Sequence, residues 1–214
     1  MSIKVINKPR VIPDRRGYRN AKRIMDLVLC LVALPIALPL GILIGVAIRL
    51  DSRGPILFIQ QRTGIGGKRF RMYKFRTMVA NADELKITLS HLNELTPPDF
   101  KITNDPRVTR VGHILRKTSM DELPQIINIL KGEMSWVGPR PTSFGAETYS
   151  LWHTERLEVT PGLTGLWQVA GRSDLDFDER LKLDIEYIEK QNLWLDICIL
   201  FQTVGAVLTR KGAK

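Results

Sequence analysis

The chain has 214 residues, enough for one domain with a core of its own. Its formal net charge of +10 and its isoelectric point near 9.9 favour an anionic partner, which could be nucleic acid, anionic lipid or a phosphorylated small molecule. Two cysteines exclude a disulfide framework and fit a reducing cytoplasm, and the sequence has no Cys/His spacing of the zinc-binding kind.

The first 50 residues divide into a basic lead-in at residues 1–23 and a predicted membrane helix at residues 24–50. The lead-in contains Pro9 and Pro13, and we expect it to be extended at first and helical towards its end. It does not resemble a cleavable signal, because the apolar run that follows is too long and begins too late.

Residues 27–48 carry no charged side chain, and as a helix they would be about 33 Å long, against about 30 Å for the hydrocarbon core of a bilayer. Pro35 and Pro39 predict a bend, because each removes a backbone donor and clashes with the preceding turn. Both flanks are basic, and the preference of Lys and Arg for the cytoplasmic side is met at both ends only if the helix returns to the same face. The pattern therefore favours a re-entrant helix over a straight crossing, with a buried core helix as the remaining alternative.

A β-hairpin is predicted next, with strands at residues 56–61 and 69–76. The loop around Gly64, Gly66 and Gly67 lacks the ending of a phosphate-binding loop, so it is interpreted as an ordinary turn. The second strand places Lys74 among cationic and aromatic residues, which form either a membrane-facing basic surface or part of an anion site. Residues 81–95 are predicted to be a helix that ends before Pro97.

The segment at residues 107–132 contains the strongest candidates for chemistry. Ser119 and Glu122 have the spacing of a capping box, and Gly132 is placed to end the helix that they begin. Asp121 and Glu122 would then lie in the first turn of this helix, directly after the cations Arg116 and Lys117. Acidic residues there commonly complement the helix dipole, but the surrounding cations also favour phosphate chemistry. Two adjacent carboxylates could hold Mg²⁺, and one could attack phosphorus.

Two further segments could bind phosphate or nucleotide. Arg140 lies between Pro139 and Pro141, which would stiffen the backbone and fix the guanidinium for a bidentate phosphate contact, unless the segment is a plain turn. Residues 160–173 form a glycine-rich stretch with Trp167 and Arg172, which could grip a base and a phosphate or simply connect two elements.

The C-terminal part is predicted to be helical. Asp176 and Glu179 have the spacing of a cap for a helix that contains Leu181 and Ile188. Residues 193–209 are almost wholly apolar and could be a core helix or an interfacial one, and the interface is preferred.

These elements predict an α+β fold that is mostly helical, with a small β-hairpin. The predicted organisation has three parts: the lead-in at residues 1–23, the re-entrant membrane helix at 24–50, and a cytoplasmic catalytic domain at 51–214. Its amphipathic helices, including the C-terminal one, would lie in the membrane interface, so that the protein is monotopic.

Five motifs resemble those of the bacterial sugar transferases, or monotopic phosphoglycosyl transferases, and they follow the family's order along nearly the whole chain. They are Lys22-Arg23-x-x-Asp26, the run from Tyr73 to Met78, the run from Arg116 to Gln125, Gly138-Pro139-Arg140-Pro141, and the stretch from Pro161 through Arg172.

The resemblance implies an enzyme that moves a sugar-1-phosphate from a UDP-sugar to undecaprenyl phosphate, releases UMP and initiates the assembly of a cell-surface glycan. It implies that Asp121 is a nucleophile that forms a covalent phosphosugar intermediate and binds Mg²⁺, with Glu122 in support. Arg116 and Arg140 match positions that contact phosphate, and Lys74 and Arg172 are further candidates for binding the phosphates or the nucleotide.

The resemblance also implies a re-entrant helix that is broken at a Ser-Pro pair, on the cytoplasmic face of the bacterial inner membrane. Pro39 matches that proline, whereas Leu38 replaces the serine and Pro35 is additional. Larger members carry an additional multispanning region, and this chain is interpreted as the minimal catalytic module.

Two other classes of protein remain open: a membrane-anchored basic binding protein and a membrane scaffold. The sequence has no helix-turn-helix or RRM signature, so no nucleic acid is expected as a partner. The identity of the sugar, the glycan pathway and the oligomeric state, a homodimer included, are not determined by the sequence.

Overall fold

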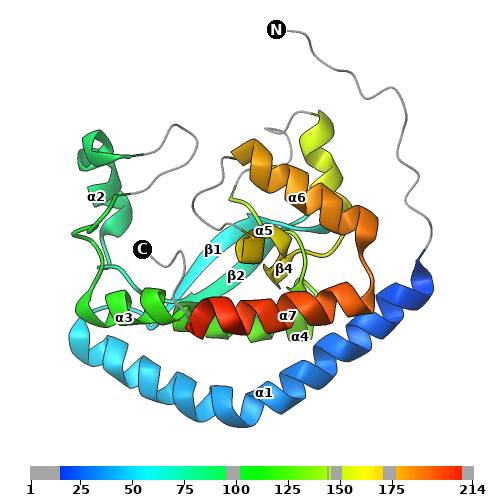
Figure 1. The fold of residues 1–214 in the computed structure, drawn as a ribbon. Helices are drawn as coiled ribbons and strands as arrows, with labels where there is room; N and C mark the ends of the chain where they lie inside the picture. The colour runs from blue at the N-terminus through cyan, green and yellow to red at the C-terminus, as the bar shows by residue number, and fades with distance from the viewer. Residues whose placement is uncertain (1–14, 95–101, 144, 146–150, 171–176, 209–214) are drawn as a thin grey trace, which may run out of the picture.

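The chain folds into a mostly helical α+β structure with two small sheets, which lie on one side of a long N-terminal helix (Figure 1). The computed structural model describes residues 15–94, 102–143, 145, 151–170 and 177–208. The helices are α1 (Arg16–Asp51), α2 (Ala82–Thr88), α3 (Arg110–Thr118), α4 (Ile126–Lys131), α5 (Leu166–Ala170), α6 (Phe177–Lys190) and α7 (Leu193–Leu208). The strands are β1 (Leu57–Thr63), β2 (Arg69–Phe75), β3 (Ser135–Val137) and β4 (Gly162–Thr164).

Helix α1 is 36 residues long and contains both Pro35 and Pro39. Figure 1 shows that it curves in its middle, with its convex side turned away from the rest of the chain, as expected for two internal prolines. The structure corrects the expected break at Pro39, because one continuous helix passes through both prolines. The helix also begins at Arg16, within the segment assigned to the lead-in.

Polar contacts tie both halves of α1 to the rest of the protein. In the first half, the Asp26 carboxylate accepts hydrogen bonds from Ser135 Oγ at 2.9 Å and from the Trp136 backbone N–H at 3.1 Å. At the other end, Asp51 accepts a 3.0 Å bond from the backbone N–H of Val111 at the start of α3. The two ends of α1 are therefore held against the same body.

The predicted hairpin is confirmed: β1 and β2 pair in antiparallel register and are joined by a turn at Ile65–Gly67. The helix predicted at residues 81–95 is shorter, because α2 ends at Thr88 and a separate 3₁₀ turn follows at Ser90–Leu92. After β2, residues 76–79 run beside residues 107–109, where Thr109 donates a 3.0 Å backbone bond to Thr77. This contact places the start of α3 next to the end of the hairpin.

The capping box predicted for Ser119 and Glu122 is wrong. Ser119 instead ends α3 in a left-handed conformation, with φ of 57°, and its side chain makes no capping hydrogen bond. Residues Met120–Gln125 form a 3₁₀ turn, and α4 begins only at Ile126 and ends at Lys131, with Gly132 as its C-cap as expected. Asp121 and Glu122 therefore lie in a tight connection between α3 and α4, and not in the first turn of an α-helix.

The glycine-rich stretch at residues 160–173 is more regular than a loop as far as residue 170, because it contains β4 and α5. Strand β4 pairs in parallel with β3. The predicted cap at Asp176 lies outside the described residues, and α6 and α7 follow as two consecutive helices.

Apolar side chains gather in three buried clusters, around Cys30 and Ile129, around Ile48 and Leu115, and around Val137 and Tyr187. Other apolar side chains remain exposed on α3, α4 and α7, which Figure 1 shows at one level beside α1. The most exposed are Ile114 at 63%, Trp194 at 72% and Phe201 at 75%. Within the described residues, α1 is the one helix long and apolar enough to cross a membrane by length and composition, with 11% of its most apolar window buried.

Candidate active site

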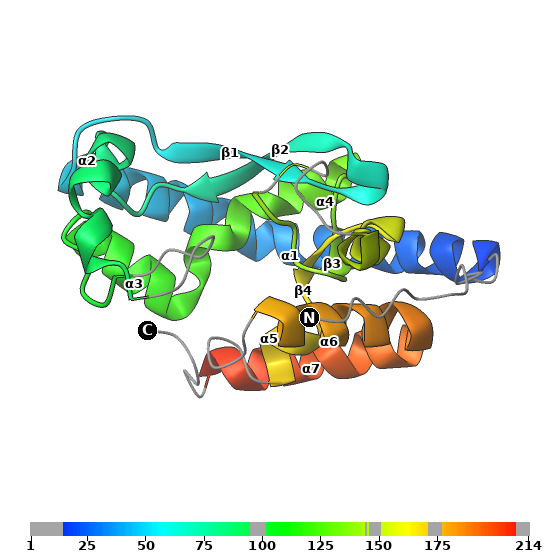
Figure 2. The same ribbon diagram turned by 90° about the horizontal axis from the view of Figure 1, so that it is seen from above.

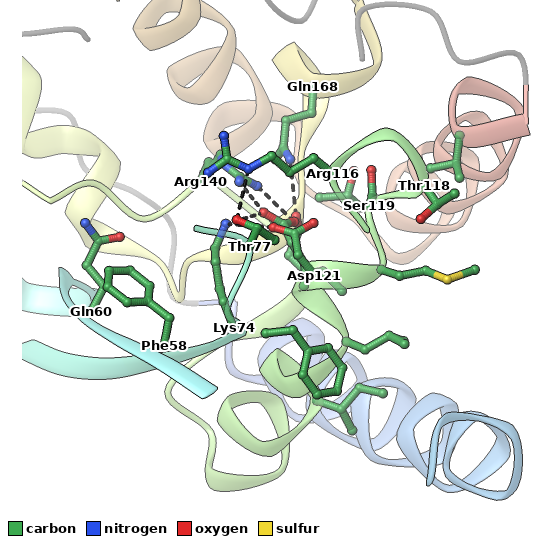
Figure 3. A pocket seen from close by; sticks show the side chains of 18 of the residues that line it. Phe58, Gln60, Lys74, Thr77, Arg116, Thr118, Ser119, Asp121, Arg140 and Gln168 are labelled. Carbon is green, nitrogen blue, oxygen red and sulfur yellow. Dashed lines mark hydrogen bonds and ion pairs between the residues drawn. The ribbon is translucent and has the colours of Figure 1, made fainter. Parts of the chain in front are cut away.

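Asp121 and Glu122 lie at the polar centre of a cavity of about 1250 Å³. Figure 3 shows Lys74, Arg116 and Arg140 directed towards the carboxylates from three different parts of the chain. Lys74 comes from β2, Arg116 from the last turn of α3, and Arg140 from the segment after β3. The fold therefore brings together five of the six site residues predicted from the sequence.

Glu122 is held by two cations. Its carboxylate accepts a 2.7 Å hydrogen bond from Lys74 Nζ and two further bonds from the Arg140 guanidinium. Burial acts to raise the pKa of Glu122, but the positive charges of Arg140 and Lys74 outweigh burial and hold that pKa well below its ordinary value. Glu122 is therefore a fixed anion, and it sets the positions of both cations.

Asp121 has different surroundings although it is the adjacent residue. Its nearest ion-pair partner, Lys74 Nζ, is 3.8 Å away, and within the described chain its carboxylate accepts no hydrogen bond. Burial raises the pKa of Asp121, and the charge of Glu122 adds to the rise, against the opposing charges of Lys74, Arg140 and Arg116. Its oxygens face the cavity and are available to a ligand there.

Arg116 is positioned by the close contact between α3 and the end of the hairpin. Its Nε donates a 2.9 Å hydrogen bond to Thr77 Oγ1, and the rest of the guanidinium lines the cavity. This contact requires Gly112, because a Cβ there would lie 2.1 Å from the Thr77 carbonyl oxygen. A short α3 with glycine on its inner face thus aims a cation at the site.

Arg140 is fixed by the parallel pairing of β3 and β4. Gly138 donates a 2.9 Å backbone bond to Thr164, and Gly162 donates one of 2.9 Å to Pro139. A Cβ on Gly162 would lie 2.1 Å from the Gly138 nitrogen, so these two backbones approach closely only with glycine there. The Arg140 carbonyl also accepts a 2.6 Å bond from Arg156. Strand pairing therefore holds the backbone at Arg140, and the stiffening expected from Pro139 and Pro141 stays a prediction.

The cavity has a charged part and an apolar part. The charged part contains the acidic pair and its cations, and the apolar part is lined by side chains from α1 and α7 and from the 3₁₀ turn. Phe58, Gln60 and Gln168, labelled in Figure 3, also line the cavity. Such a cavity can receive a ligand with a phosphate group and an apolar or aromatic extension.

Some residues that line the cavity were not predicted from the sequence, and some predicted residues do not line it. Thr77 lies in one of the quoted motifs, yet its role in holding Arg116 depends on a contact between residues 39 positions apart. Gln168 lies in the quoted stretch at residues 160–173 but was not singled out within it, and Phe58 gave no signal beyond its predicted strand. Arg172 lies outside the described residues, so its predicted role stays a prediction. Pro35 and Pro39 are not among the residues that line the cavity.

The described residues contain no group of three or more His, Cys, Asp or Glu side chains that could hold a metal ion. Mg²⁺ does not need such a group, because it is commonly bound by one or two carboxylates together with substrate phosphates and water. The Asp121 carboxylate faces the cavity and fits that kind of site. The Glu122 carboxylate fits it less well, because it already accepts hydrogen bonds from Lys74 and Arg140.

The chain is similar to a known family and to several known proteins over most of its length. A family model described as bacterial sugar transferase matches residues 17–210. The undecaprenyl-phosphate galactose phosphotransferase of Salmonella typhimurium is 46% identical over 93% of this chain, and the galactosyl transferase CpsE of Streptococcus agalactiae is 44% identical over 91%. The chain spans 43% of the length of each of these two relatives.

A relative of similar length is the exopolysaccharide production protein ExoY of Rhizobium meliloti. It is 38% identical over 97% of this chain and 96% of its own length. The matched region of the family model includes α1, the hairpin, the acidic pair and the Arg140 segment. The chain therefore belongs to the bacterial sugar transferase family.

Proposed function

We propose that this protein transfers a sugar-1-phosphate from a UDP-sugar to undecaprenyl phosphate and thereby initiates the assembly of a cell-surface glycan. The relatives' names support the substrate class: one is an undecaprenyl-phosphate galactose phosphotransferase, and one from Caulobacter vibrioides is a UDP-glucose:undecaprenyl-phosphate glucose-1-phosphate transferase. The observation that carries the proposal is the pair of adjacent carboxylates in one cavity, of which Glu122 is bound by cations while Asp121 faces open space.

The proposed reaction has two displacements at the phosphorus that bears the sugar. An Asp121 oxygen attacks this phosphorus, the bond to the bridging oxygen breaks, and UMP leaves with the bonding electrons. The phosphate oxygen of the lipid then attacks the same phosphorus, which releases Asp121 and forms the lipid diphosphate sugar. A carboxylate suits the first step because its ionised form is already nucleophilic and needs no base to activate it.

The cations have distinct roles in this proposal. Arg116 and Arg140 stabilise the negative charge that develops on the phosphates, since each presents guanidinium N–H groups to the cavity. Lys74 lies between the two carboxylates, at 2.7 Å from Glu122 and 3.8 Å from Asp121, and orients them relative to each other. Glu122 positions Lys74 and Arg140. Mg²⁺, held by Asp121 and the donor phosphates, would neutralise part of the pyrophosphate charge.

A site at a membrane surface would suit a lipid acceptor, and the long apolar helix α1 supports that position. We infer that α1 enters the bilayer, bends and returns to the cytoplasmic face, because both of its ends are tied to the catalytic body. The exposed apolar side chains of α3, α4 and α7 would then rest in the interface beside it. This arrangement holds Asp121 at the depth of a lipid phosphate while the soluble donor enters from the cytoplasm.

The first displacement needs no lipid, which gives the test. Purified protein with Mg²⁺ and a matching UDP-sugar from a panel is expected to release UMP in a burst stoichiometric with enzyme, before any lipid is added. Asp121→Asn is expected to abolish the burst, whereas Glu84→Gln, a change on the exposed surface of α2, is expected to retain it. Release of UMP only when undecaprenyl phosphate is present would exclude the covalent step.

A further inference from the structure

We propose that Asp184 and Arg156, which are buried behind the active site, are positioning residues that hold Arg140 in place for the donor phosphates. This inference rests on the proposed function and deepens it, because it names two residues on which the action of Arg140 depends. Asp184 lies in the middle of α6, and Arg156 lies in a 3₁₀ segment at Leu151–Glu158. That segment, yellow-green in Figure 1, lies against α6. Both residues are outside the set that lines the cavity around Asp121.

One guanidinium connects the two buried residues to the site. Arg156 Nη2 lies 2.7 Å from Asp184 Oδ2 and donates a 2.6 Å hydrogen bond to the carbonyl oxygen of Arg140. The Arg140 side chain in turn binds the Glu122 carboxylate and lines the cavity. A chain of contacts therefore runs from α6, through Arg156, to the backbone that carries the Arg140 guanidinium.

Carbonyl oxygens hold the backbone at residues 139–141, because the two prolines there have no N–H to donate. Consecutive carbonyls accept hydrogen bonds from three different elements: the first from Gly162 in β4 at 2.9 Å, the second from Arg156 at 2.6 Å and the third from Arg62 in β1 at 3.2 Å. Arg156 supplies the middle bond, at the residue whose side chain reaches the site. Its loss would free the backbone at the point where position matters most for the guanidinium.

Stability alone does not account for this ion pair. Its side chains are 6% and 2% exposed, and moving two charges out of water costs free energy that the pairing only partly returns. Apolar side chains of similar size commonly give a fold the same stability or more. They cannot supply N–H groups in a fixed, planar arrangement, which a guanidinium does. Asp184 therefore holds Arg156 in the orientation in which it reaches Arg140.

The Asp184 carboxyl changes its charge near neutral pH. Burial raises its pKa to about 7, against the opposing charges of Arg156 from the 3₁₀ segment and of Arg180 from α6 itself. Above this pH the ionised carboxylate pairs with Arg156, and below it the neutral carboxyl loses the ionic attraction. The hold on Arg140 is therefore expected to strengthen as the pH rises through about 7.

The test measures how fast the UDP-sugar loads the enzyme, as the rate of the UMP burst without lipid at a limiting concentration of UDP-sugar. Asp184→Asn keeps the shape of the side chain but removes its charge, whereas Arg156→Lys keeps the charge but replaces the planar guanidinium by one ammonium group. Glu186→Gln is the matched control, because Glu186 lies on the same helix in an ion pair with Lys190 and is 43% exposed. Each protein is measured at about pH 6 and about pH 8, on either side of the Asp184 pKa.

At about pH 8, Asp184→Asn and Arg156→Lys are expected to load about tenfold more slowly than the wild type, because a displaced guanidinium stabilises the phosphates less well. Glu186→Gln is expected to load like the wild type at both pH values. At about pH 6 the wild-type Asp184 is largely neutral and resembles asparagine, so both differences are expected to shrink to about twofold. Thermal unfolding at both pH values identifies a variant that has lost its fold, in which case the other variant decides.

Loading at the wild-type rate in both variants at about pH 8 would overturn the inference. A defect of the same size at both pH values would also overturn it, because a residue that only stabilises the fold would not make loading follow the titration of Asp184. A wild-type protein that releases no UMP contradicts the proposed function itself, and the inference falls with it.

Discussion

Asp121 and Glu122 are neighbours in the chain, but their surroundings hold their carboxyl groups in different states. Glu122 is bound by Lys74 and Arg140, which keep its pKa low, whereas burial raises the pKa of Asp121 and no hydrogen bond compensates it within the described chain. A carboxylate with few partners in the protein loses few interactions when it bonds to phosphorus, so its reaction is more favourable in free energy than that of a well-paired carboxylate. The geometry therefore favours Asp121 as the nucleophile and Glu122 as the residue that positions the cations.

This difference predicts opposite effects on stability. Asp121→Asn removes a buried charge with weak compensation, so it is expected to leave the melting temperature unchanged or to raise it, while activity is lost. Glu122→Gln leaves Lys74 and Arg140 facing each other without their anion, and we expect it to lower stability by about 1–3 kcal/mol. Thermal unfolding in Mg²⁺-free detergent solution measures both effects. Equal destabilisation by the two changes would contradict the assignment of different roles.

The sequence predicted which residues gather at the site better than it predicted the contacts between them. Asp121, Glu122, Arg116, Arg140 and Lys74 could be chosen because adjacent carboxylates among cations are unusual and because the motifs resemble a family. The contact of Arg116 with Thr77 could not be predicted, since it depends on how closely α3 approaches the hairpin across Gly112.

At the scale of elements, the N-terminal half of α1 depends on one buried carboxylate. Asp26 is 3% exposed and accepts hydrogen bonds from Ser135 and from the Trp136 backbone, while Arg23 donates to the backbone carbonyls of Ile129 and Leu130 at the end of α4. Neither Arg23 nor Arg49, the arginines closest to the two ends of the apolar run, is bonded to Asp26 in the structure, because both donate to backbone carbonyls. The motif of Lys22, Arg23 and Asp26 therefore attaches the membrane helix to β3, α4 and α7.

Asp26→Ala is expected to weaken this attachment. It leaves the Ser135 hydroxyl and the Trp136 N–H without their acceptor in a buried place, at a cost of about 1–3 kcal/mol. Asn20→Ala, an exposed position on the same helix, serves as the control and should have little effect. Thermal unfolding in nanodiscs compares the two variants, and an Asp26→Ala protein as stable as the control would show that the bonds contribute nothing to the attachment.

The prediction of elements succeeded where the pattern was local. The hairpin follows from two strand-like runs around a glycine-rich loop, α6 from apolar periodicity and α7 from a nearly continuous apolar run, and the structure confirms all three elements. The connection from α3 to α4 was predicted wrongly, because Ser119 and Glu122 have capping-box spacing while packing forces Ser119 into a left-handed turn that ends α3. The parallel pairing of β3 and β4 joins strands too short to leave a sequence signal.

At the scale of the whole molecule, α1 would determine where the catalytic body stands relative to a bilayer in the proposed topology. Its 36 residues correspond to about 54 Å of helix, well beyond the hydrocarbon thickness of about 30 Å. The proposed entry and return on one face rests on the curve in Figure 1 and on the contacts at both ends of the helix. The basic flanks favour this topology, which stays a prediction, whereas the unbroken course of the helix through both prolines could be learned only from its structure.

A labelling experiment tests the topology. In a Cys30→Ala, Cys198→Ala background, Gly17→Cys and Arg53→Cys are expected to react with a membrane-impermeant maleimide from the same side of sealed vesicles, because both positions would lie on the cytoplasmic face. Both residues are exposed in the structure, so steric protection does not confuse the result. Labelling from opposite sides would establish a helix that crosses the membrane.

The central claim is that Asp121 carries the sugar phosphate between donor and acceptor, and the mass of the protein itself tests it most directly. After incubation with Mg²⁺ and the matching UDP-sugar but no lipid, intact-protein mass spectrometry is expected to show one added sugar phosphate, and peptide mapping is expected to place it on Asp121. The addition should disappear when undecaprenyl phosphate is supplied. An active enzyme whose mass stays unchanged, or an adduct on a residue other than Asp121, would contradict the account.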